Sequence, residues 1–380
     1  KFEFAPHANL ITLRDIQGKA AVGGEITGVG KINLGKTPQL DFNFAAKKIS
    51  GDALAKIYET IPPIQIGTVS ATAQLTGAAN NVQTVVKWQA PEATYAGTGE
   101  TVIAADRSLT FRNVALNVGG GMVRGSGSFA QGRWRADTQA SGVGLTPFVD
   151  PNQLQSISLT GAEFNGRLIL EGSAEPFQIA TIRSEGAGVN IGGGTIAVSR
   201  IQLQDKNFSA QLVANGVRLG RILKASPPAL AGSLAGTFEV AGNTENFGLS
   251  TLRGTGEARL NVAGGTVTAS KIQLANGRYQ AQVQANNLAV QQLAAVPKQF
   301  QGALTGQFQV AGSVESFSPE AIQASGQGRL NIAGGTITAS NIQLANGRYQ
   351  GQVQTNNLPL QELVAVPPQF QGGLTGELNV

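Results

Sequence analysis

A stretch of 48 residues occurs twice in this 380-residue chain, and this repeat constrains the fold more than any other feature. The first copy, at 259–306, begins RLNVAGGTVTASKIQLANGRYQ, and the second copy, at 329–376, begins RLNIAGGTITASNIQLANGRYQ. Of the 48 positions, 37 are identical, and the numbering of the copies differs by a fixed offset (329 − 259 = 70). Self-similarity at a fixed period is typical of repeat arrays, so we interpret the whole chain as a series of structural repeats.

Within each copy, apolar and polar residues alternate in short runs. Tyr279, Ala281 and Val283, for example, are separated by glutamines. Alternation with a period of two indicates strands that have one apolar and one polar face. The pair Asn276-Gly277 separates two such runs, and Asn-Gly is the strongest short hairpin signal. Neighbouring strands are therefore predicted to be antiparallel, because a two-residue link cannot join parallel strands.

One short helix is predicted in each repeat, after the last run of alternation. Leu288, Val290, Leu293 and Val296 have roughly helical spacing and precede Pro297. Corresponding residues are Leu54, Ile57 and Ile61 in a helix over 52–61, the set Val217, Leu219 and Ile222, and the set Leu358, Leu360, Leu363 and Val366. Near Leu145, Phe148 and Leu154, prolines interrupt the pattern, so only a turn is predicted there. The apolar stripe of each helix is expected to cap the apolar interior of the sheet or to pack on the edge of the sheet, and simple core packing is the interpretation that we favour.

Recurring glycines set the boundaries of the repeats. Gly172, Gly242 and Gly312 are evenly spaced (242 − 172 = 70 and 312 − 242 = 70), whereas Gly77 lies further from Gly172 (172 − 77 = 95). We therefore predict one continuous array with five parts: a partial first repeat at 1–77 with helix 52–61, a longer repeat at 78–172 with an inserted hairpin, repeats at 173–242 and 243–312, and a truncated repeat at 313–380. Because the chain begins without methionine and stops inside a repeat, we interpret it as a piece of a longer protein.

The strand pattern predicts an all-β fold of about 22–25 strands with short helices, stacked about 4.8 Å apart. A sheet with one apolar face must hide that face from water. It can close around a filled core, or it can curl into a half-pipe whose apolar trough holds something else. The residue pattern favours these two alternatives equally. The predicted apolar face consists of Val189, Ile191, Ile196, Ile201, Leu203, Phe208, Leu212, Leu260, Val262, Val267, Ile272, Leu274, Tyr279, Val283, Leu330, Ile332, Ile337, Ile342, Leu344, Tyr349 and Val353.

The composition argues against several classes of function. The chain has no cysteine and one histidine, His7, so disulfides, thiolate metal sites and a histidine-dependent catalytic site are not expected. Charged residues make up 13%, and no run of lysine or arginine occurs that would bind nucleic acid. No apolar run reaches the ~18 residues of a membrane span. We expect no enzyme activity, no cofactor and no metal.

A basic cluster occurs at Arg218, Arg221 and Lys224, on one side of a predicted helix. It is consistent with contact to an anionic lipid headgroup. A solvated helix face is the interpretation that we favour, because exposed charges of this kind usually face water.

The repeat string resembles the TamB family (translocation and assembly module subunit). The motif G-x-G-x-L-N-x-x-G-G-T is followed by N-G-R-Y, by a leucine-bearing segment and by P-P-x-F-x-G. The sequence is most similar to the branch from cyanobacteria and chloroplasts. The resemblance implies an elongated antiparallel β-sheet curled into a taco-like half-pipe with an apolar interior. It also implies that the apolar residues given above line a groove for lipid acyl chains.

The resemblance further implies a place and a role for the protein. Members of this family of bridge-like lipid-transfer proteins are anchored in the inner membrane, cross the periplasm and meet an outer-membrane barrel of the Omp-eighty-five type. We therefore expect a periplasmic segment that conducts phospholipids or glycolipids between the two membranes. An alternative is a scaffold or chaperone for assembly of outer-membrane proteins. A third possibility is a structural filament or adhesin with a sealed core.

Overall fold

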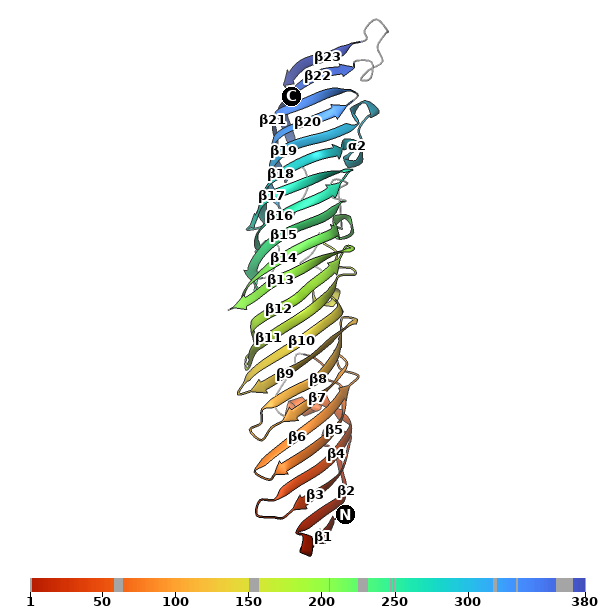
Figure 1. Ribbon diagram of the computed structural model, residues 1–380, viewed down its shortest axis with the longest axis vertical. Coiled ribbons are helices and arrows are strands. Elements are labelled where there is room, and N and C mark those ends of the chain that lie inside the picture. Colours follow the sequence, from red (N-terminus) through yellow and green to blue (C-terminus); the bar gives the residue numbers. More distant parts are fainter. Residues whose placement is uncertain are drawn as a thin grey trace. The chain divides into compact units, whose positions relative to one another are not determined.

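The structure of the chain is a computed structural model, and it describes residues 2–57, 64–149, 157–204, 206–224, 232–246, 248, 250–316, 320–332, 334–359 and 372–379. Its strands belong to one antiparallel sheet of 23 strands (Figure 1). The prediction of an antiparallel all-β fold with about that many strands is thus confirmed.

The strands alternate with a few short helical turns. The strands are β1 (Phe2–Ala5), β2 (Leu10–Lys19), β3 (Glu25–Asn33), β4 (Gln39–Ser50), β5 (Thr68–Ala78), β6 (Asn81–Ala90), β7 (Gly97–Ile103), β8 (Leu109–Val118), β9 (Gly121–Ala130), β10 (Arg133–Gly144), β11 (Glu163–Ala174), β12 (Phe177–Ile191), β13 (Gly194–Gln204), β14 (Asn207–Arg218), β15 (Ser233–Asn243), β16 (Arg253–Val262), β17 (Gly265–Ala275), β18 (Arg278–Ala289), β19 (Gly302–Ser313), β20 (Gln323–Ile332), β21 (Gly335–Ala345), β22 (Arg348–Pro359) and β23 (Gly373–Asn379). The helical turns are η1 (Pro6–Ala8), α1 (Gly51–Ile57), η2 (Thr146–Phe148), η3 (Leu219–Arg221), α2 (Val290–Leu293) and η5 (Lys298–Phe300).

Strand pairing follows the order of the chain. Each strand from β1 to β9 pairs with the strand that follows it, and so does each strand from β12 to β22. Among the described residues, β1 is paired with β2 and β23 with β22, so the sheet is not closed. Pairing between sequence neighbours is what short hairpin links favour.

The chain forms two compact units. The first consists of residues 1–144 and 164–185, and the second of residues 145–163 and 186–380. Strands β1 to β11 therefore belong to the first unit, and β13 to β23 to the second. The segment 78–172 contains six strands, β6 to β11. The segments 173–242 and 243–312 correspond to four strands each, β12 to β15 and β16 to β19.

The hairpin turns and the bulges recur in register with the repeat. Asn276 and Gly277 have φ values of 50° and 69°, and both residues of the turn lie in the left-handed region that a type I′ hairpin requires. Lys271 and Asn341, which occupy equivalent positions of the two copies, also have positive φ and sit at interruptions of the β17–β18 and β21–β22 ladders. Such bulges bend a strand and increase its twist.

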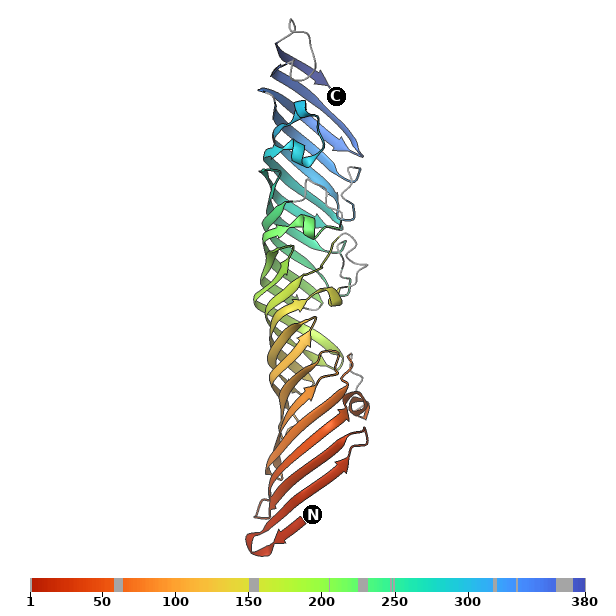
Figure 2. The ribbon, with the colours of Figure 1, turned by 90° about the vertical axis from the view of Figure 1, so that its right-hand side faces the viewer.

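Five segments that each link two paired strands are here called rim segments. They follow β4, β10, β14, β18 and β22, and their described residues are 51–57 and 64–67, 145–149 and 157–162, 219–224 and 232, 290–301, and 372. In both ribbon views the rim segments of the second unit that contain η3 and α2 lie along one side of that unit (Figures 1 and 2). A bulge precedes each of these two, with Gly216 and Asn287 at positive φ.

The predicted helices are shorter than expected. Leu288, Leu358 and Val217, predicted on helices, are strand residues that pair with Leu304, Leu374 and Leu234. The helical prediction was wrong at these three positions because the following strand supplies backbone partners, and that long-range pairing overrides local spacing. Helix α1 begins at Gly51, and its described part ends at Ile57. The predicted helical residues Ile61, Leu360, Leu363 and Val366, and the turn residue Leu154, lie outside the described residues.

Candidate functional site: an apolar sheet face with a closed rim

The apolar face of the second unit can be traced from strand to strand through the ladders. Residues directly opposite each other in an antiparallel pair project from the same face. Leu234 lies opposite Leu260, and Leu260 lies opposite Val267. In the second copy, Leu330 lies opposite Ile337 in the same way. The bulges keep this assignment, because the ladders on both sides of each bulge pair apolar with apolar residues. All residues predicted for the apolar face lie on this one face.

Most of this face is not covered by a second layer. Ile191, Leu203, Leu260, Val262 and Ile332 are buried. Tyr349 is 73% exposed. The remaining predicted residues of the face are partly exposed. Apolar side chains in a filled core are covered on every side, whereas most of these side chains remain partly exposed.

Most of the buried part of the face lies at the rim segments. One cluster joins Ile191, Ala214 and Val217 of the sheet to Ala162 and Ile222 of two rim segments. A second cluster joins Leu260, Val262, Ala285 and Leu288, with Leu219 and Leu293 of two rim segments packed against it. The rim segments thus cover the strand ends that carry these residues, and the rest of the apolar face stays partly open.

Aromatic side chains on this face lie over glycines of the neighbouring strand. Phe238 is opposite Gly256, and a methyl group on that glycine would lie 2.7 Å from Phe238 Cδ1. Phe308 and Gly326 repeat the arrangement, with a corresponding distance of 2.8 Å. Glycine in a strand marks such a close approach. Because each ring occupies the space over the neighbouring glycine, it leans across the sheet and adds apolar area to the face.

Tyr279 follows the same rule at Gly312. A methyl group on Gly312 would lie 2.6 Å from the Tyr279 hydroxyl oxygen. The partial burial of Tyr279 raises the pKa of its phenol, because burial disfavours the phenolate. The ring therefore belongs to the apolar face although it carries a polar atom.

The sequence-based selection missed the residues of β15 and β19 on this face. Phe238 and Val240 of β15, and Leu304, Phe308 and Val310 of β19, continue the face between strands that were selected. A signal was present, since Phe238 and Val240 alternate with Thr237 and Glu239. These strands were identified only through their glycines, and their apolar residues were not carried into the set.

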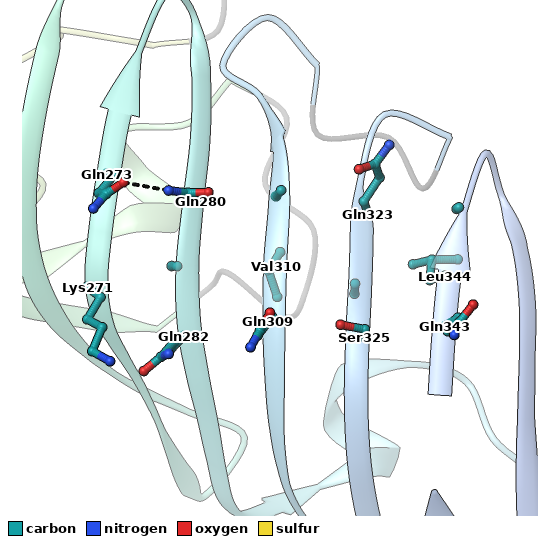
Figure 3. A pocket seen from close by; sticks show the side chains of 14 residues that line it. Lys271, Gln273, Gln280, Gln282, Gln309, Val310, Gln323, Ser325, Gln343 and Leu344 are labelled. Atoms are coloured by element: carbon teal, nitrogen blue, oxygen red, sulfur yellow. Dashed lines mark hydrogen bonds between the residues drawn. The ribbon is translucent and has the colours of Figure 1, made fainter. Parts of the chain in front are cut away.

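The opposite face carries glutamine side chains in rows across the strands. Gln282 lies opposite Gln309, and Gln309 lies opposite Ser325. Figure 3 shows these side chains around a shallow hollow of about 620 Å³. Gln280 Nε2 donates a hydrogen bond of 2.5 Å to Gln273 Oε1, and the equivalent glutamines of the second copy form the same bond. This face is exposed to solvent, and its neutral amide side chains form hydrogen bonds across the hairpins.

The first unit carries a network of ionic contacts on β10, β11 and β12. Arg167 donates hydrogen bonds to both carboxylate oxygens of Asp137, at 2.8 and 2.5 Å, and one of 2.7 Å to Glu185. The Arg167 guanidinium lowers the pKa of the Asp137 carboxyl. A further ion pair joins Arg135 and Glu171. Each carboxylate in this network has an arginine partner, as expected for strands held together by charge, and none lies free for proton transfer.

No group of side chains suited to metal binding occurs among the described residues. His7 lies in η1 and is exposed. The described part of the chain contains neither a group of three or more potential metal ligands nor a helix long and apolar enough to cross a membrane. The feature of the second unit that stands out chemically is therefore its partly open apolar face.

Comparison with known proteins identifies no relative. No family model matches the chain, and no curated protein and no solved structure is significantly similar to it.

Proposed function

We propose that this chain is a segment of a TamB-like conduit that binds lipid acyl chains on its apolar face. The observation that carries the proposal is the continuity of that face from β12 to β22, with most of its side chains only partly covered. A lipid acyl chain binds to smooth apolar surface and needs no fixed polar partner. The side chains of valine, isoleucine and leucine provide such a surface.

The energetics favour a lipid that stays bound to the apolar face and can still move along it. Removing alkyl surface from water stabilises the complex by about 25 cal/mol per Å², or about 0.8 kcal/mol per CH₂ group. Successive strands offer nearly identical apolar surface, so a chain that moves along the face exchanges one set of contacts for an equivalent one. Leucine opposite leucine and phenylalanine over glycine recur along the sheet, which supports this interpretation.

The proposal includes a setting for the whole protein. The cargo would be phospholipid or glycolipid, and the chain would act in the periplasm without catalysis. Its partners would be the inner membrane and an outer-membrane barrel of the Omp-eighty-five type. These parts of the proposal come from the family resemblance.

The proposal is tested by lipid binding to variants of the apolar face. Val267 and Ile337 occupy corresponding places on it, so Val267→Asp and Ile337→Asp should each introduce a charge among alkyl groups and reduce bound lipid several-fold. The matched controls are Thr268→Asp and Thr338→Asp, which place the same charge one residue away on the exposed opposite face.

Bound phospholipid is counted by native mass spectrometry of the purified chain after incubation with vesicles. Circular dichroism checks that each variant keeps its β-structure. Equal lipid occupancy in Val267→Asp and Thr268→Asp would contradict a role for the apolar face, as would a wild-type chain that carries no lipid.

A second candidate function is a scaffold that holds nascent outer-membrane strands. β1 and β23 each have one described strand partner, and an extended client segment can add to a strand with a free edge. Photo-crosslinkers separate the two functions. A crosslinker at Val267 should capture lipid under the conduit proposal, whereas capture of unfolded porin by a crosslinker at Glu377 of β23 would favour the scaffold.

A further inference from the structure

Three cations lie at the junction between β14 and the rim segment that follows it. Arg218 ends β14, Arg221 ends η3, and Lys224 follows closely. Arg218 and Arg221 both lie beside the turn between β12 and β13, since the Arg218 N–H donates to the carbonyl oxygen of Gly192 and Arg221 Nη1 lies close to Gly193. All three residues are exposed, and none of the ion pairs recorded among the described residues involves them.

The cations lie beside the buried end of the apolar face. Val217 and Ile222, which are 1% and 8% exposed, belong to the cluster around Ile191. Arg221 reaches the turn between β12 and β13, since a methyl group on Gly193 would lie 3.1 Å from Arg221 Nη1. Positive charge and apolar surface therefore meet within a few residues.

This rim segment is held in place from two sides. The backbone N–H of Arg218 donates to the carbonyl oxygen of Gly192 at 3.3 Å, and that of Ser158 donates to the carbonyl oxygen of Ile222 at 2.6 Å. The backbone that carries the cations is therefore fixed to β12 and to the preceding rim segment.

The other rim segments lack such a cluster in their described parts. In the segment that contains α1, the Asp52 carboxylate accepts hydrogen bonds of 2.8 Å from the N–H groups of Ile66 and Gly67, and Lys56 is its one cation. The segment that contains α2 carries one cation, Lys298. A charge pattern confined to one rim segment is not required by the repeat, because the repeat supplies the same strands without it.

We propose that Arg218, Arg221 and Lys224 bind the anionic headgroup of a lipid whose acyl chains lie on the adjacent apolar face. This inference rests on the proposed function and adds a headgroup class to it, namely a phosphate-bearing group with net negative charge. The planar guanidinium group of arginine donates paired hydrogen bonds to phosphate oxygens, and the ammonium group of lysine contributes a compact positive charge. The apolar face continues from the buried cluster into the partly exposed side chains of Val189 and Ile196, and this accessible apolar surface favours a lipid over a soluble anion.

The test compares two triple variants of the full chain that lose the same charge. R218Q/R221Q/K224Q removes the rim cluster. K271Q/R278Q/R348Q removes three exposed cations of the second unit elsewhere. Each protein is incubated with vesicles that contain equal amounts of phosphatidylglycerol and phosphatidylethanolamine, re-isolated, and analysed by native mass spectrometry for the number and class of bound lipids.

The expected result is an enrichment of phosphatidylglycerol by about fivefold in the wild type and in K271Q/R278Q/R348Q, comparable to the effect of one cation near an anionic surface. R218Q/R221Q/K224Q should bind the same total amount of lipid at the input ratio. Added salt should weaken the enrichment without releasing the lipid.

Several results would overturn the inference. Lipid bound without enrichment, or an enrichment equally reduced in both triple variants, would refute the headgroup site and leave the conduit proposal intact. Binding of inorganic phosphate at micromolar concentration by the lipid-free chain, with no lipid preference, would identify a free-anion site instead. A wild-type chain that binds neither lipid would overturn this inference together with the proposed function.

Discussion

The two copies of the repeat have nearly the same sequence, yet equivalent residues have different surroundings. Tyr279 of the first copy lies opposite Gly312 of β19 and is partly buried. Its counterpart Tyr349 is 73% exposed. The β22–β23 ladder begins at Gln352, beyond Tyr349 in the chain, so no described residue takes the place of Gly312.

This difference shows that burial on the sheet comes from the neighbouring strand and not from the residue itself. The two tyrosines follow the same Asn-Gly turn and lie opposite equivalent leucines, Leu274 and Leu344. A one-layer sheet lacks a second layer that would bury a side chain from above. Each strand therefore depends on its two neighbours, as repeat proteins depend on adjacent repeats.

The largest expected effect comes from truncating a buried leucine, and it should be equal in the two copies of the repeat. Leu288 and Leu358 are 4% and 2% exposed. Leu288→Ala and Leu358→Ala should each lower the local free energy of opening by about 3 kcal/mol, because each leaves a cavity in a well-packed site. Hydrogen exchange of the β18 and β22 amides measures this. Leu288→Met keeps the volume and should cost less than about 1.5 kcal/mol. A marked difference between the two alanine variants would contradict equal packing.

Substitution of one pair of equivalent glycines should show the largest difference in stability between the two copies. A methyl group on Gly306 would lie 2.7 Å from the Gln327 carbonyl oxygen and 2.7 Å from Phe308 Cε2, whereas one on Gly376 would have no neighbour within 4 Å. Gly306→Ala should therefore destabilise β19 by about 2 kcal/mol through overpacking. Gly376→Ala should stay within about 0.5 kcal/mol. Hydrogen exchange of the β19, β20 and β23 amides measures the destabilisation caused by each substitution. Equal destabilisation by Gly306→Ala and Gly376→Ala would contradict the difference in packing.

The tyrosines provide a smaller contrast. Tyr279→Ala should cost about 1.5 kcal/mol, roughly half the value for a fully buried aromatic residue, because its ring covers Gly312. Tyr349→Ala should cost less than about 0.5 kcal/mol because its ring is already in water. Local opening of β18 and β22 is again measured by hydrogen exchange. A loss as large at Tyr349 as at Tyr279 would mean that a further contact buries the second ring.

The smallest effect concerns the glutamine pairs, where the copies should again be equal. Gln280 and Gln350 donate hydrogen bonds of 2.5 and 2.6 Å to Gln273 and Gln343. Both pairs are exposed, so Gln280→Ala and Gln350→Ala should each cost about 0.5 kcal/mol, near the lower limit for one hydrogen bond. Exchange of the amides that flank each turn detects this. A cost at either site well above that of a single hydrogen bond would show that the amide row stabilises the sheet cooperatively.

Sequence pattern was sufficient where the physics is local. Alternation identified the strands, because side chains of a strand project to opposite faces in turn. Asn276-Gly277 identified a hairpin, because few residues adopt two successive positive φ values. The fixed period of the repeat identified the array and its apolar face, whose residues the ladders bring to one side.

The sequence did not predict how the strand ends are completed. Leu288 has helical neighbours in the sequence, but its backbone pairs with Leu304. Phe238 alternates with polar residues and could have been selected from the sequence, but the glycines that Phe238 and Phe308 cover on another strand could not be predicted from it. Both outcomes depend on residues brought together by the sheet.

The chain's own sequence thus determined the strand periodicity, the antiparallel pairing and the composition of each face, since these follow from residues close together in the chain. The tertiary structure alone decided which apolar residues are buried, where the rim segments cover the sheet and where cations meet apolar surface. The physical reason is that burial depends on the atoms of neighbouring strands and rim segments, and no single strand contains that information.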